Sequence, residues 1–156
     1  MGLDQYLYAR QYLSPSEWRG EEEKKKFDSV MDAIGATTLV TTDLPSAQVE
    51  IKVGYWRKSN QIHQWFVDNC QDGNDDCREA YVSRDQLQEL LNLCKEVSAD
   101  HSLAEELLPC QGGFFFGSTE YDEWYYSDID DTVTMLTDVL ERMPTEMWDF
   151  AYQSSW

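Results

Sequence analysis

The chain has 156 residues, and its 30 Asp and Glu residues face only 12 Lys and Arg residues, which gives a formal net charge of -18. This length suits a single domain over residues 1–156 with one sizeable core. The charge disfavours direct binding to nucleic acid or to an anionic membrane, and it favours a basic partner. Because no apolar run could span a bilayer and no charged-then-apolar leader opens the chain, we expect a cytoplasmic protein.

Alternation and helical spacing predict the first elements. Residues 3–13 alternate, with apolar or aromatic groups on both sides, which predicts a central strand. Residues 21–34 place Phe27 and Met31 four apart, after three acids and before Gly35, which predicts a helix.

The middle of the chain continues with strand and helix signals. Residues 37–56 contain β-branched clusters around a proline turn, which predicts one or two strands. A helix then begins near Lys58 or Ser59 and ends in an acidic turn. Residues 79–82 predict a short strand.

Two more helices follow this strand. Ser83 and Gln86 are spaced as a capping box, which predicts the start of a helix that runs through Cys94. A shorter helix over residues 102–108 is stopped by Pro109.

The last third mixes aromatic and acidic residues. Residues 111–126 place three phenylalanines between glycines, which predicts a strand, a turn and a strand. Ser127 and Asp128 are predicted to open a last helix. Its core stripe, at helical spacing, comprises Ile129, Val133, Leu136 and Leu140. After Pro144, alternation over residues 147–153 predicts a closing strand.

These elements intermix without a regular βαβ rhythm, internal repeat or linker. The sequence therefore predicts an α+β fold in one domain, with a mixed or antiparallel sheet and about four helices packed mainly on one face.

The loop from Asp68 to Glu79 approaches the spacing of a calcium-binding loop. However, Cys70 stands where the third position requires an oxygen ligand, and Asp75 stands where an apolar residue is expected. We therefore predict no metal and no cofactor. The four cysteines lack CxxC spacing, and free thiols are expected at Cys70, Cys77, Cys94 and Cys110.

The segment from residue 55 to residue 66 concentrates aromatic and cationic groups in an acidic chain. In one interpretation, Trp65 and Phe66 belong to the core and the cations form a solvated rim. In the other, the segment is a site for a nucleotide or another phosphate-bearing ligand at a helix N-terminus. That site would comprise Tyr55, Trp56, Arg57, Lys58, Asn60, His63 and Trp65.

The segment from Glu120 to Glu141 mixes carboxylates with Tyr and Trp, a composition suited to protein interfaces. Five acids would replace nucleic-acid phosphates on a partner: Asp122, Glu123, Asp128, Asp131 and Asp138. Trp124 and Tyr125 would anchor the partner. The alternative is a solvated acidic face. His63 could act as a general base, but the chain contains no nucleophile elbow, HExxH motif or P-loop, so binding is favoured over catalysis.

Three segments carry a resemblance: "MGLDQYLYAR", "YWRKSNQIHQWFVDN" and "FFFGSTEYDEWYY". Together they resemble a family of small, acidic, uncharacterised proteins of bacteriophages and prophages. The resemblance implies a phage or prophage origin, and hence the cytoplasm of a host cell. In that setting we expect a non-catalytic protein that inhibits a host DNA- or RNA-binding defence factor through its acidic surface.

Overall fold

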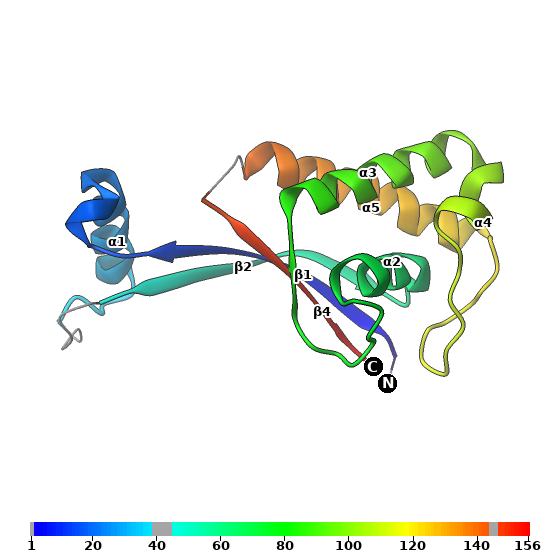
Figure 1. Ribbon diagram of the computed structural model, residues 1–156, viewed down its shortest axis with the longest axis horizontal. Helices are drawn as coiled ribbons and strands as arrows, with labels where there is room; N and C mark the ends of the chain where they lie inside the picture. The colour runs from blue at the N-terminus through cyan, green and yellow to red at the C-terminus, as the bar shows by residue number, and fades with distance from the viewer. Residues whose placement is uncertain (1, 39–44, 144–146) are drawn as a thin grey trace. The chain divides into compact units, whose positions relative to one another are not determined.

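Four strands form one antiparallel sheet in the order β2-β1-β4-β3 (Figure 1). The computed structural model describes residues 2–38, 45–143 and 147–156. The strands are β1 (Asp4–Leu13), β2 (Ala47–Arg57), β3 (Ala80–Val82) and β4 (Asp149–Ser155). The last of them in the chain lies inside the sheet, where Phe150 of β4 pairs with Val82 of β3.

Five α-helices occur within these described residues. They are α1 (Glu21–Ala33), α2 (Asn60–Cys70), α3 (Arg84–Ala99), α4 (Ala104–Leu107) and α5 (Glu123–Arg142). Short 3-10 helices, η1 (Glu17–Arg19) and η2 (His101–Leu103), precede α1 and α4. The predicted α+β class is confirmed, with an antiparallel sheet and one helix more than the four expected. No described helix combines the length and the apolar character that crossing a membrane requires.

The chain packs as two compact units, and the smaller one comprises residues 10–50. Its hydrophobic cluster joins Leu13 of β1 to Phe27 and Met31 of α1. Phe27 and Met31 lie four residues apart and therefore share one face of the helix, as the sequence predicted. Within the same unit, Arg10 Nε lies 2.5 Å from Glu50 Oε2.

The larger unit comprises residues 1–9 and 51–156. In its part of β1, Gln5, Leu7 and Ala9 are buried, whereas the residues between them are half-buried. This period of two turns one face of the strand toward the core. Buried residues of α2, α3, α5 and β4 belong to the same hydrophobic cluster as Leu7 and Ala9, so the helices of this unit cover that face.

Helices α3 and α5 lie side by side in the larger unit (Figure 1). Ser98 Oγ donates a 2.6 Å hydrogen bond to Asp130 Oδ1 between them. Arg84, at the start of α3, donates to the carbonyl oxygens of Leu140 and Met143 at the end of α5. A cation at this helix end satisfies carbonyl groups that have no partner within the helix.

Several local predictions are confirmed. Ser83 and Gln86 form both hydrogen bonds of the capping box at the start of α3. The predicted strands over residues 3–13, 79–82 and 147–153 correspond to β1, β3 and β4. For residues 37–56, where one or two strands were predicted, the structure contains β2. Residues 39–44 lie outside the described residues.

The predicted strands over residues 111–126 are wrong. Residues 109–122 form no regular element, and α5 begins at Glu123 rather than near Ser127. Asp122 is the reason, because its Oδ1 accepts hydrogen bonds from the backbone nitrogens of Trp124 (3.0 Å) and Tyr125 (3.1 Å). This N-cap outweighs the preference of the aromatic residues for strands.

Candidate functional site

Most of the aromatic and polar residues predicted near the start of α2 are buried. Trp56 and Trp65 belong to the hydrophobic core, and Trp56 Nε1 donates a 2.8 Å hydrogen bond to Thr132 Oγ1 of α5. The core interpretation of Trp65 and Phe66 is therefore confirmed. Trp56 and Trp65 fit the alternative ligand site poorly, because they are only 4% and 7% exposed.

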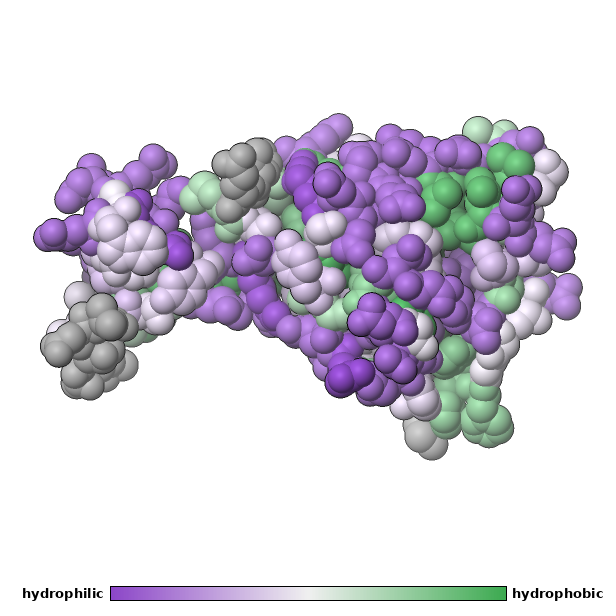
Figure 2. Space-filling model, viewed as in Figure 1, coloured by the Kyte–Doolittle hydropathy of each residue, from purple (hydrophilic) through white to green (hydrophobic). Residues whose placement is uncertain are grey.

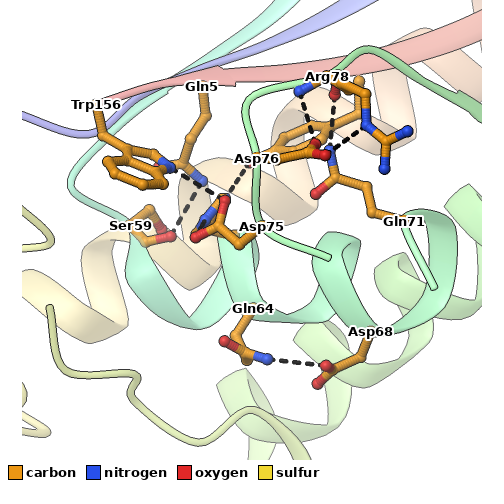
Figure 3. Close-up of polar contacts among 11 residues, drawn as sticks. Gln5, Ser59, Gln64, Asp68, Gln71, Asp75, Asp76, Arg78 and Trp156 are labelled. Carbon is orange, nitrogen blue, oxygen red and sulfur yellow. Dashed lines mark hydrogen bonds and ion pairs between the residues drawn. The ribbon is translucent and has the colours of Figure 1, made fainter. Parts of the chain in front are cut away.

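His63 is fully buried in a polar network. Its Nδ1 lies 2.8 Å from the hydroxyl of Tyr152, and its Nε2 lies 3.0 Å from Asp75 Oδ2. Trp156 Nε1 donates a 3.0 Å hydrogen bond to the other carboxylate oxygen of Asp75 (Figure 3). Burial raises the pKa of Tyr152, whose ring stacks on Phe66. Both nitrogens of His63 are thus occupied inside the protein, which favours a structural role over that of a ligand or a general base.

Asn60, at the start of α2, fixes the loop that precedes α5. Its Nδ2 donates to the carbonyl oxygens of Phe116 (3.1 Å) and Ser118 (2.8 Å), and its Oδ1 accepts from the backbone nitrogen of Gln111 (2.9 Å). The side chain is 2% exposed. Asn60 therefore holds the loop in place, and its amide is not free for a ligand.

The same loop carries exposed aromatic surface. Phe114 is 96% exposed, and its ring meets that of Phe115 edge to face at 4.8 Å. Hydrophobic side chains gather at the lower right of Figure 2, where Figure 1 places the loop between α4 and α5. Leu3 donates from its backbone nitrogen to Phe115 O (3.0 Å), which ties the loop to the start of the chain.

A pocket of about 230 Å³ lies where β2 passes into α2, and we call it the junction pocket. Its wall joins two sets of residues that the sequence had assigned to separate sites. One set contributes the cations Arg57 and Lys58, and the other contributes Asp122, Trp124 and Asp128. Segments more than sixty positions apart in sequence thus form one concave surface.

Backbone geometry places Lys58 at the mouth of this pocket. Its φ of 60° lies in the left-handed region, which a residue with a side chain seldom adopts. Gly117, with φ of 89°, passes so close that a Cβ there would lie 3.1 Å from the Cβ of Lys58. Strained backbone of this kind is held by its surroundings and is common at functional sites.

Asp128 is a half-buried carboxylate of the pocket, as is Asp122. Burial raises its pKa above the ordinary value of 3.8, and the neighbouring Ser59 and Gln61 side chains oppose the rise. The nearby carboxylates of Asp131 and Asp122 raise it further. The Asp128 carboxylate is therefore a desolvated group that a cation would stabilise.

Helices α3 and α5 carry a group of exposed carboxylates. We define the acidic helix pair by eight exposed residues: Asp85, Glu89, Glu96, Glu123, Asp130, Asp131, Asp138 and Glu141. Hydrophilic side chains cover much of this part of the molecule in the view of Figure 2. The exposed cations on the two helices are Lys95 and Arg142, and Arg142 pairs with Asp138. The pair therefore keeps a strong excess of negative charge.

The predicted partner-binding residues occupy three different environments. Glu123, Asp131 and Asp138 are exposed on α5, and Trp124 is 74% exposed. Asp122 and Asp128 line the junction pocket. The prediction that Tyr125 is a surface anchor is wrong, because its ring is 4% exposed and its hydroxyl donates to Leu108 O. In the ligand-binding set, Tyr55 is half exposed, and its hydroxyl donates to Asp4 Oδ1.

The acidic loop from Asp68 to Glu79 is held by pairs within the protein. Asp76 pairs with Arg78 at 2.5 Å, Gln64 donates to Asp68, and both contacts are drawn in Figure 3. No group of three potential metal ligands is found among the described residues. The four cysteines are free, and burial raises the pKa of Cys94 to about 12.

Five residues that line the pocket were not among the predicted site residues: Gln61, Cys110, Gly117, Ser118 and Glu120. Gln61 lies inside the stretch that drew attention, but an uncharged side chain in a helix gave no signal of its own. Cys110 precedes the glycine-rich loop and was predicted only as a free thiol. No family model, curated protein or solved structure matched this chain. The resemblance to phage proteins thus stays a prediction.

Proposed function

We propose that this protein is a non-catalytic binding protein of phage type, which inhibits a host DNA- or RNA-binding defence factor. The acidic helix pair would occupy the basic surface that this factor uses for nucleic acid. One observation carries the proposal: two adjacent helices expose eight carboxylates but only two cations among the described residues. Such an excess of one sign attracts a basic partner and repels nucleic acid.

The neighbouring surface supports the same function. Trp124 exposes most of its indole one residue after Glu123, so an aromatic side chain stands beside the carboxylates. Interfaces concentrate their binding energy in such residues, because an aromatic ring buries a large area at low entropic cost. His63 is buried, and each of its ring nitrogens is hydrogen-bonded within the protein, which supports binding rather than catalysis.

The test begins with a pull-down from bacterial lysate, followed by binding measurements with each purified partner. Asp131→Lys combined with Asp138→Lys reverses two exposed charges on α5. We expect this variant to bind the partner at least about tenfold more weakly. A close charge pair across a well-studied protein interface contributes about 1.5 kcal/mol or more. Wild-type binding should also weaken steeply with salt, because the Debye length falls from about 10 Å at 0.1 M to about 3 Å at 1 M.

A matched control separates a specific surface from overall charge. Asp28→Lys combined with Asp32→Lys makes the same change in net charge on exposed positions of α1, in the smaller unit. This control should bind like the wild type. Equal losses of affinity in both variants would show that the acidic helix pair is not the interface. An affinity that changes neither with salt nor with charge reversal at Asp131 and Asp138 would show the same. The partner's nucleic acid should also compete with the protein.

A further inference from the structure

The junction pocket holds charged groups of both signs that do not pair with each other. Lys58, Glu120 and Asp128 line it, and none of the three forms an ion pair with another residue that the structure describes. Arg57 lies 3.6 Å from Asp4 Oδ1 and also interacts with the Tyr55 side chain, but more than half of its own side chain is exposed. Both cations and at least two carboxylates therefore remain available to a ligand.

A buried donor also faces this pocket with only a weak contact to the protein. Gln61 is 3% exposed, and its Nε2 has no hydrogen bond of normal geometry among the described residues, although the side chain lies close enough to the Asp128 carboxyl to lower its pKa. The side chain lines the pocket beside the Asp128 carboxyl. Ser59 Oγ, in the same neighbourhood, is likewise buried without a hydrogen bond of normal geometry to the described residues, and it too lowers the pKa of Asp128. Buried donors are rarely left with weak hydrogen bonds, so a ligand oxygen would complete the hydrogen bonding of these two side chains.

Size and charge restrict the ligand. The volume of about 230 Å³ lies below the range of roughly 300 to 1,000 Å³ typical of sites for drug-sized molecules. A nucleotide is too large to be enclosed there. Three carboxylates, from Glu120, Asp122 and Asp128, would also repel a phosphate group. These two features argue against the phosphate-bearing ligand predicted from residues 55–66.

The walls of the pocket are fixed before a ligand arrives. Asn60 binds three backbone groups of the loop, and the backbone nitrogen of Lys58 donates to Leu3 O at 2.8 Å. Asp122 is held by its two capping hydrogen bonds. A small ligand therefore need not order these segments, which is what preorganisation contributes to affinity.

We propose that the junction pocket binds a small zwitterion, a free α-amino acid. Its carboxylate faces Lys58 and Arg57, and its ammonium group faces Asp128 and Glu120. Gln61 Nε2 donates to a ligand oxygen, and the exposed indole of Trp124 covers the ligand side chain. This inference goes beyond the function proposed for the acidic helix pair and does not depend on it.

The experiment is an NMR titration of the isotopically labelled protein with each proteinogenic L-amino acid in turn. We expect at least one amino acid to shift the side-chain amide signal of Gln61 and the indole signal of Trp124 in a saturable manner. The matching amine, without the carboxylate, and the matching carboxylic acid, without the ammonium group, should each bind at least about tenfold more weakly, because each loses a charge-assisted hydrogen bond.

Variants test the assignment of the charges. Lys58→Met and Asp128→Asn should each weaken binding of that amino acid at least about tenfold, with the remaining spectrum unchanged as proof of folding. Lys95→Met, an exposed position on α3, should leave binding unchanged. Asp138→Lys with Glu141→Lys, two exposed positions near the end of α5 that do not line the pocket, should weaken partner binding at least about tenfold but spare the amino acid, so the two proposals fail separately. Absence of saturable shifts, equal binding of the amine or the acid, or tighter binding of ATP or inorganic phosphate would overturn the inference.

Discussion

The imidazole of His63 lies 2.8 Å from the hydroxyl of Tyr152, and this contact joins α2 to β4 inside the larger unit. Both residues are fully buried, and Asp75 occupies the second imidazole nitrogen. A buried polar network of this kind stabilises a fold only while every member keeps its partners. The contact therefore makes the hydroxyl of Tyr152 important beyond the area that its ring buries.

Removal of that hydroxyl should destabilise the protein. Tyr152→Phe keeps the ring that stacks on Phe66 at 3.9 Å but leaves His63 Nδ1 buried without a partner. We expect a loss of about 1–3 kcal/mol in the free energy of unfolding, measured by urea denaturation. Tyr81→Phe, on an exposed position of β3, should change it by less than about 0.5 kcal/mol. Equal effects of the two substitutions would contradict the role of the network.

Asn60→Ala should destabilise the protein more strongly. The substitution removes three hydrogen bonds and leaves Phe116 O, Ser118 O and Gln111 N without their partner. We expect a loss of about 2–4 kcal/mol, since each orphaned group costs about 1 kcal/mol or more. Asn92→Ala, on the exposed side of α3, is the control and should be near neutral. A loss below about 1 kcal/mol in the free energy of unfolding for Asn60→Ala would mean that the loop keeps its conformation without the Asn60 side chain.

Lys58→Gly should stabilise the protein. Glycine adopts the left-handed region without strain, and a non-glycine residue there costs about 1 kcal/mol or more. The same change at Lys95, within α3, should instead destabilise by about 1 kcal/mol, because glycine is a poor helix former. Thermal or urea denaturation measures whether each substitution raises or lowers the stability of the protein. Loss of stability at both positions would show that contacts of the Lys58 side chain outweigh its backbone strain.

Asp128→Asn should stabilise the protein near neutral pH. Burial raises the pKa of Asp128, so the folded protein takes up a proton at a higher pH than the unfolded chain does. The stability of the wild type therefore rises as the pH falls through the folded pKa, and the gain is complete below the ordinary value of 3.8. The advantage of the Asn variant should shrink over the same window.

Melting temperatures across the acidic range provide the measurement for Asp128. Glu141→Gln, at an exposed position near the end of α5, is the control and should show no such trend. An advantage of Asp128→Asn that stayed constant from neutral to acidic pH would mean that titration of this carboxyl is not its cause.

The sequence predicted those parts of the fold that depend on local patterns. The capping box at Ser83 and the alternation in β1 involve residues a few positions apart, and both were found. The start of α5 was missed because aromatic residues from Phe114 to Tyr126 favour strands, whereas one side chain, Asp122, decides the helix boundary. An Asp before a run of possible helix residues was the available signal.

The candidate site could be predicted only in pieces. Arg57 and Lys58 were singled out for an anion, and Asp122, Trp124 and Asp128 for a basic partner. Their meeting in one pocket depends on how β2, α2 and the start of α5 pack, and no pattern within either segment encodes that. Burial of Asn60 and His63 also depends on distant partners, Ser118 and Tyr152 among them.

The position of β4 inside the sheet has a consequence for biosynthesis. A ribosome makes β1, β2 and β3 before β4, so β1 and β3 become neighbours of β4 only after residues 149–155 exist. The sheet of the larger unit can therefore be completed only after these residues have been translated, with long loops to close first. Until then, the strand edges that β4 will cover stay open to other chains, and this is the stage at which aggregation competes with folding.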